Sequence, residues 1–180
     1  MPAIDTVAVG DVDTEVLEQL ARGLAQELAA EVAVRAPVPL PPDTYNAGRC
    51  QYSSTEVLRH VSGTSRPAPG ILLAVTSADL YVPELNFVFG EAHPATRSCI
   101  ISLARLGVAR ADARAGSPAG RERLLERALT EAIHEIGHVL GLGHCSCRTC
   151  VMFFSNSILD TDRKGHRFCD KCCQRAAKSY

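Results

Sequence analysis

The residues best suited to chemistry lie in one stretch, His134–His144, with the sequence HEIGHVLGLGH. On a helix, His134 and His138 are one turn apart on one face, so both imidazoles can bind one metal ion. Gly141 allows the helix to end in a left-handed turn, after which the returning chain can supply His144 as a third ligand. Three neutral imidazoles leave one position of a tetrahedral zinc ion open for water, which is typical of a catalytic site. Glu135 adjoins His134 and can take a proton from that water.

The pattern HExxHxxGxxH resembles that of the metzincin zinc peptidases. Metzincins have a methionine turn after the third histidine, and Met152 stands at a suitable position for it. The alternative is a helix end with solvated histidines. A bare HExxH would leave that alternative open, but the additional glycine and histidine at fixed offsets make a coincidence a poorer explanation.

Six of the eight cysteines follow this motif in the last third of the chain. One directly follows the third histidine, a second lies five residues on in C-x-M, and a CxxC comes later. This arrangement resembles the archaemetzincins (archaelysins), in which four cysteines hold a second, structural zinc. The resemblance assigns that role here to Cys145, Cys150, Cys169 and Cys172. The gap after the methionine is one residue shorter than the family spacing, so Cys173 in place of Cys172 is an alternative.

Four thiolates fill the coordination of zinc, so such a site stabilises structure and performs no hydrolysis. Cys145 adjoins His144, and the site would therefore hold the turn that carries the third catalytic ligand. The resemblance implies two zinc ions per chain, one catalytic and one structural. A disulfide framework is the alternative for eight cysteines. The amino terminus has no basic run followed by an apolar segment, which favours thiols in a reducing cytoplasm.

Length and charge narrow the class of protein further. The chain has 180 residues, enough for one compact domain, and a formal net charge of -1. This charge gives no electrostatic reason to expect nucleic acid or an anionic membrane as a partner. No apolar run approaches the length of a membrane span. We expect a cytoplasmic monomer whose partner is a peptide or protein substrate.

The first part of the chain predicts the sheet that must position the histidines. Residues 3–10 alternate as in a strand, leucines recur at helical spacing over 14–30, and 31–35 predicts a second strand. This order indicates a βαβ unit with parallel strands. The apolar run 70–76 predicts a central strand buried on both faces, and 98–106 predicts the last strand of the sheet.

Two further segments are similar to segments of archaemetzincins. Residues 85–92 predict a strand, which in metzincins is the antiparallel edge to which substrate adds as an extra strand. The resemblance implies that the backbone of Phe89–Ala92 lines the substrate groove; an ordinary hairpin partner is the alternative. The segment Arg49–Tyr52 precedes a helix expected to end near Val61. We interpret Arg49 as bracing a loop and Tyr52 as buried.

The long helix that carries the first two histidines has a clear start. Ser117 is suited to cap it and Pro118 to occupy its first position, so we expect a helix to about Leu140. Glu131 lies one turn before the first histidine and could orient a ligand, although an i,i+4 salt bridge with Arg127 is the simpler role. We expect a loop over 107–116 and a short helix over 171–178 that closes the structural site.

Together these features predict an α/β (α+β), metzincin-like single domain over residues 1–180. Residues 1–141 would hold the mixed twisted sheet, its packed helices and the active-site helix, and 142–180 the methionine turn in a small zinc-stapled lobe. We expect a zinc-dependent peptidase with Glu135 as general base. The alternatives are a zinc-stabilised peptide- or protein-binding module with a blocked or vestigial site, and a zinc hydrolase of small amides. The resemblance suggests aminopeptidase-like activity, but trimming and internal cleavage both stay open.

Overall fold

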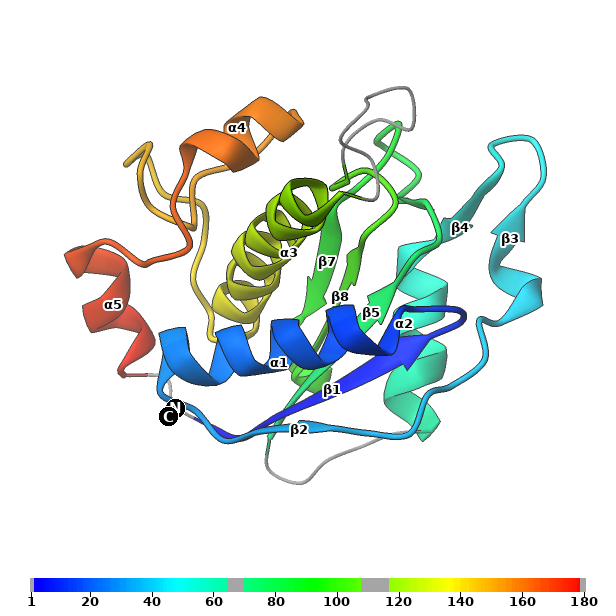
Figure 1. Cartoon of the computed structure of the whole chain (residues 1–180), viewed down its shortest axis with the longest axis horizontal. Coiled ribbons are helices and arrows are strands. Elements are labelled where there is room, and N and C mark those ends of the chain that lie inside the picture. Colours follow the sequence, from blue (N-terminus) through cyan, green and yellow to red (C-terminus); the bar gives the residue numbers. More distant parts are fainter. Residues whose placement is uncertain (1, 65–69, 108–116, 179–180) are drawn as a thin grey trace.

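The computed structural model describes residues 2–64, 70–107 and 117–178 (Figure 1). Its main sheet has five strands in the order β2-β1-β5-β8-β7. Neighbouring strands are parallel except at one edge, where β7 runs antiparallel to β8. The predicted βαβ unit, central strand and antiparallel edge are confirmed. The bounds are β1 Ile4–Val9, β2 Val32–Val34, β5 Ile71–Thr76, β7 Gly90–His93 and β8 Ser98–Ser102.

Helices cover both faces of this sheet. Helices α1 (Thr14–Leu28) and α3 (Pro118–Val139) lie on one face and α2 (Ser54–Thr64) on the other (Figure 1). Successive side chains of a strand point to opposite faces. In β5, Leu73 therefore packs into the core beneath α1 and α3, whereas Leu72 packs into the core beneath α2. This double burial explains the unbroken apolar run of the central strand.

A second, three-stranded sheet was not predicted from the sequence. It consists of β3 (Tyr45–Asn46), β4 (Gln51–Ser53) and β6 (Leu80–Tyr81), in the order β3-β4-β6. Strands of two or three residues are too short to show a periodicity. Tyr52, which we expected to be buried, is only half-buried, and its ring lies 4.9 Å from that of Tyr45.

Several predicted boundaries were wrong. The strand expected from residue 85 begins only at Gly90, because Leu85–Phe89 forms an irregular loop with a single bridge to β6 through Val88. The strand expected to reach residue 106 ends at Ser102, whose hydroxyl accepts a hydrogen bond from the amide of Ala104 and so favours a turn. Helix α2 continues to Thr64. Of the loop expected over 107–116, residues 108–116 lie outside the described part of the chain.

In the described residues after α3, up to residue 178, the structure has two short helices, α4 (Ile158–Arg163) and α5 (Asp170–Ala176). In Figure 1 α4 (orange) lies at the upper left and α5 (red) at the left edge, both on the side of α3 away from the sheet. α5 confirms the closing helix that was predicted. α4 was missed, although Ser157 and Asp160 form a capping box at its start.

Within the described ranges, no helix has the length and apolar character needed to cross a membrane.

Candidate functional site

Helix α3 and the turn after it bring three histidines together. Ser117 caps the helix by accepting the amide of Gly120 at 3.1 Å, as predicted. Gly141 adopts a φ of +80° and reverses the chain, so that the ring of His144 comes to lie 5.5 Å from that of His134 and 4.9 Å from that of His138. One ligand nitrogen from each of the three histidines lies within 4.8 Å of the others, and the group could hold a metal ion.

The hydrogen bonds of two histidines leave the correct nitrogens free for a metal. The Nδ1 atoms of His134 and His138 lie 2.7 and 2.8 Å from the carbonyls of Val151 and Leu142. Because a carbonyl only accepts, each Nδ1 must carry the proton. The two Nε2 atoms face one another 3.1 Å apart. Two nitrogens bound to one tetrahedral zinc would be about 3.3 Å apart, so the donor set fits zinc.

Burial keeps these imidazoles neutral in the metal-free protein. Burial, assisted by the nearby positive charge of Lys164, lowers the pKa of His134 to about 3. Burial also lowers the pKa values of His138 and His144. Neutral imidazole is the form that binds a metal, so the site is ready for a cation at ordinary pH.

The methionine turn packs directly beneath these ligands. Met152 is fully buried, and a Cβ atom added to Gly137 would lie 2.3 Å from its sulfur. This contact explains why the helix contains a glycine despite the propensity cost. Backbone carbonyls of the turn also reach the site: that of Val151 accepts a hydrogen bond from His134, and that of Met152 accepts the amide of Cys145 at 2.8 Å.

The side chain of Glu135 projects from α3 toward the edge strand β7. This side chain is buried, and a Cβ atom added to Gly90 would lie 2.6 Å from its Cγ and 2.7 Å from the Ile100 carbonyl. Only glycine lets β7 pass this close. Burial, with a smaller contribution from the negative charge of Glu131, raises the pKa of Glu135 well above its ordinary value. A carboxyl with a raised pKa is suited to accept a proton and then deliver it.

Glu131 does not pair with Arg127, so that expectation was wrong. Its carboxylate accepts hydrogen bonds from the Thr161 hydroxyl at 2.7 Å and from Lys164, whose ammonium lies 3.2 Å away. Arg127 instead pairs with Asp162 at 2.7 Å. The partners on α4 and just after it were not available to a prediction that considered one helix alone.

Lys164 is a component of the site that the sequence did not reveal. Its side chain has no exposed surface, and its ammonium lies 3.4 Å from both the Phe153 carbonyl and the Nδ1 atom of His134. A buried lysine needs a partner carboxylate, and Glu131 supplies it. A lysine in a polar, irregular segment carries no sequence signal for burial.

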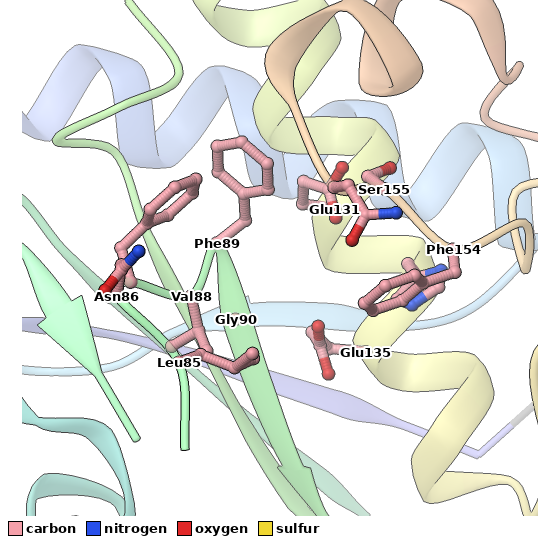
Figure 2. A pocket seen from close by; sticks show the side chains of 12 residues that line it. Leu85, Asn86, Val88, Phe89, Gly90, Glu131, Glu135, Phe154 and Ser155 are labelled. Carbon is pink, nitrogen blue, oxygen red and sulfur yellow. The ribbon is translucent and has the colours of Figure 1, made fainter. Parts of the chain in front are cut away.

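A cavity of about 220 Å³ opens beside Glu135. Figure 2 shows one wall formed by the segment before and at the start of β7, with Phe89 and Gly90, and the other by Phe154 and Ser155 after the methionine turn. The ring of Phe154 also packs 4.7 Å from that of His144. The cavity is lined by Leu85, Asn86, Phe87, Val88, Phe89, Gly90, Glu131, His134, Glu135, Phe154, Ser155 and Asn156.

The edge strand β7 offers backbone groups next to this cavity. The amide of Ser102 donates to the Phe89 carbonyl at 2.8 Å, which makes these two residues a hydrogen-bonded pair. Such pairs alternate along an antiparallel ladder, so the backbone groups of Gly90 and Ala92 point away from β8. They face the open edge, where an extended peptide could add as a further strand.

Four thiols form a second cluster at the end of α3. The ligand atoms of Cys145, Cys150, Cys169 and Cys172 lie within 4.8 Å of one another, and this group could also hold a metal ion. The sulfurs of Cys145 and Cys169 are 3.8 Å apart, and two thiolates on one tetrahedral zinc would be separated by about the same 3.8 Å. The donor set fits zinc.

Backbone amides point at the sulfurs of three of these cysteines, whereas burial raises the pKa values of Cys150 and Cys172. The amide of Cys147 points at the sulfur of Cys145 at 3.4 Å, and that of Cys169 at the sulfur of Cys150 at 3.3 Å. The amide of Cys172 lowers the pKa of Cys169 to about 7. Cys173, the alternative ligand, is exposed and does not belong to the cluster.

Other histidines and cysteines lie away from both clusters. His166 faces Glu27 on α1, with its Nε2 atom 3.4 Å from the carboxylate, and His93 bonds to Thr96. Cys99 is fully buried in the core and Cys50 is exposed in a turn.

Comparisons with known proteins find one matching family and relatives that cover most of this chain. Residues 67–178 match the profile of Peptidase family M54. The chain is 42% identical over 167 residues to an archaemetzincin of Methanocaldococcus jannaschii, covering 93% of this chain and 88% of that one. The crystal structure of archaemetzincin from Archaeoglobus fulgidus, complexed with malonate, superposes with a TM-score of 0.80 at 39% identity, over 96% of this chain and 99% of that one. A zinc-dependent peptidase from Methanocorpusculum labreanum gives 0.84 at 28% identity, over the same shares.

Proposed function

Because the chain belongs to peptidase family M54, the family of the archaemetzincins, we propose that it hydrolyses peptide bonds with Glu135 as general base. Membership implies a zinc metallopeptidase. The observation that carries the proposal is a group of three neutral imidazoles that could hold one metal ion, of which His134 lines the same cavity as the buried Glu135 and the open strand edge.

In this proposal His134, His138 and His144 hold the catalytic zinc. When bound, zinc polarises the scissile carbonyl and lowers the pKa of water. The backbone of Gly90 and Ala92 aligns the substrate, and the cavity receives one side chain next to the scissile bond. Glu135 takes the proton from the attacking water and passes it to the leaving amine. Phe154, packed on His144, closes one side of the cavity.

We further propose that Cys145, Cys150, Cys169 and Cys172 hold a second, structural zinc. Their four sulfurs would complete its coordination and leave no position for water. On this proposal the second ion fixes residues 142–180 onto the part formed by 1–141, with Met152 supporting the catalytic ligands. The proposed protein is a cytoplasmic monomer that acts on peptides, without nucleic acid or a membrane as partner.

Two observations bear on the alternatives. A binding module with a blocked site would need a chain group over the histidines, but the cysteines cluster with one another and a cavity opens beside Glu135. A hydrolase of small amides would have no use for an open strand edge. Aminopeptidase-like trimming and internal cleavage are both compatible with that edge, and the cleaved ends will distinguish them.

The test is digestion of a diverse peptide mixture by the zinc-loaded protein, read by mass spectrometry beside the Glu135→Gln variant. We expect new amino termini with the wild type only. Fragments of small amides without peptide cleavage would favour the second alternative. Absence of any turnover in a protein holding both metals, together with retained peptide binding, would favour the binding module.

A further inference from the structure

The cavity wall formed by Leu85–Phe89 is held by side chains from distant parts of the chain. Backbone pairing with neighbouring strands holds the segment only at Val88 and Phe89, so it does not fix the shape of Leu85–Phe87. The guanidinium of Arg49 donates to the Leu85 carbonyl, and the side-chain amide of Gln51 donates to the Asn86 carbonyl at 2.9 Å. Two consecutive carbonyls of the wall are thus bound by one short strand and the turn before it.

These contacts belong to a connected network. Gln51 is buried and uses its second N–H on Asp79 at 3.1 Å, while its carbonyl oxygen accepts Arg49 Nε at 3.2 Å. Asp79 in turn receives two hydrogen bonds from Arg105, at 2.7 and 2.6 Å. The guanidinium of Arg105 lies 4.4 Å over the ring of Phe87. We call Arg49, Gln51, Asp79 and Arg105 the brace.

The brace contacts the wall but does not line the cavity, because none of its members is among the lining residues. Its hydrogen bonds reach the wall's backbone and its cation covers the outer side of Phe87. The rings of Phe87 and Phe89 then pack edge to face with centroids 5.1 Å apart. The position of both aromatic side chains beside Glu135 therefore depends on residues elsewhere in the sequence.

We propose that the brace sets the side-chain selectivity of the cavity by fixing this wall. The inference rests on the proposed peptidase function and assigns a role to the Arg-x-Gln-Tyr segment beyond bracing a loop. The brace residues are positioning residues. A fixed wall binds an apolar substrate side chain that fills the cavity more tightly than a small side chain. A wall that can move discriminates less between large and small side chains.

The sharpest variant is Gln51→Glu, which keeps the shape of the side chain and its acceptor for Arg49. It removes both donors and places a second carboxylate beside Asp79. The substrates are two pairs of peptides. The members of a pair differ only by Leu or Ala, which stands before the cleaved bond in one pair and after it in the other. We expect the wild type to favour Leu in one pair by at least about 10-fold in kcat/KM, and the variant to lose about 10-fold of that ratio.

A merely structural role would leave this ratio unchanged, because partial unfolding lowers the rate on both peptides by the same factor. The kcat on the Ala peptide is expected to stay near that of the wild type, with the loss appearing in KM for the Leu peptide. The matched control is Gln19→Glu on α1, which makes the same replacement in an exposed hydrogen bond to Glu15. It should not change the ratio.

Arg49→Met is the second variant, because Arg49 is exposed and its loss leaves the core intact. We expect the same direction with a smaller change. An unchanged Leu-to-Ala ratio in both variants would overturn the inference and leave the peptidase proposal standing, as would a wild type that cleaves both peptides equally well. A wild type that cleaves no peptide would overturn the peptidase proposal and the inference with it.

Discussion

The two clusters that could each hold a metal ion are adjacent in sequence but are positioned in opposite ways. Two of the three histidines lie on α3, a helix of 22 residues that packs on β7, β8 and α1. The four cysteines lie in turns and at the start of α5, a helix of 7 residues. The core can place the histidines without a metal, whereas the cysteine segments have little regular structure of their own. The fold itself therefore positions two of the histidines, whereas on our proposal a metal bound by the cysteines would fix the segments that carry them.

The largest effect should come from breaking the cysteine cluster. Cys172→Ser removes one of four donors, and structural zinc in small domains contributes about 10–16 kcal/mol of apparent binding free energy. We expect one metal per chain to be lost and amide protection in residues 142–178 to collapse, measured by metal analysis and hydrogen exchange. Cys173→Ser is the matched control and should keep both. The reverse pattern would make Cys173 the ligand.

Next in size is the buried ion pair that links α3 to the segment after α4. Lys164→Met leaves the Glu131 carboxylate buried without a cation, which should cost about 3–5 kcal/mol in the free energy of unfolding. The double variant Glu131→Gln with Lys164→Met should recover most of that loss, as measured by urea denaturation. If the single and double variants were equally stable, the loss of stability would not come from an uncompensated charge on Glu131.

The fold elements and the two clusters were predicted from different kinds of sequence signal. The βαβ unit, the central strand and the cap at Ser117 carry local signals of periodicity and turn chemistry, and the structure confirmed them. The three histidines were predicted from their spacing, whereas the four cysteines were assigned by the resemblance to the archaemetzincins. The structure brings the expected residues together, including Cys172 rather than Cys173.

What the sequence could not predict depends on contacts between distant segments. Lys164 lies in a polar stretch, yet the structure buries it completely against Glu131, 33 residues earlier. Gln51 binds the Asn86 carbonyl 35 residues away. The packing of Met152 against Gly137 likewise joins two segments that a local sequence pattern cannot relate. Each of these depends on a tertiary approach that no local pattern encodes.

A smaller change in stability is expected from alanine substitutions at two helix glycines, one buried and one exposed. Gly137→Ala would place a methyl group against Met152, and overpacking of this kind costs about 1–3 kcal/mol. Gly63→Ala on α2 meets no atom within 4 Å, so it should stabilise by about 0.5–1 kcal/mol through helix propensity. Thermal unfolding of both variants checks the opposite signs. A stabilising Gly137→Ala would contradict the close packing of the methionine turn.

An effect of about the same size as that of Gly63→Ala is expected for the pH dependence of the metal-free protein. The folded pKa of His134 is about 3, below its unfolded value of 6.5, so the unfolded chain binds more protons as pH falls below about 6.5. Stability should therefore fall as pH is lowered, by about 1 kcal/mol from His134 between pH 7.5 and 6. Glu135, with its raised pKa, acts in the opposite direction. The Glu135→Gln substitution removes that contribution. If urea denaturation of this variant, after its metals are chelated, showed a rise in stability toward pH 6, the burial of neutral histidines would be contradicted.

The most direct test of the central claim is to count metals and measure peptide cleavage in His138→Ala. If the histidines perform the chemistry and the cysteines hold the structure, this variant will keep one zinc per chain, unfold near the wild-type midpoint and cleave no peptide. Two zinc ions still bound, or cleavage that persists in the purified variant, would contradict the assignment of the two sites.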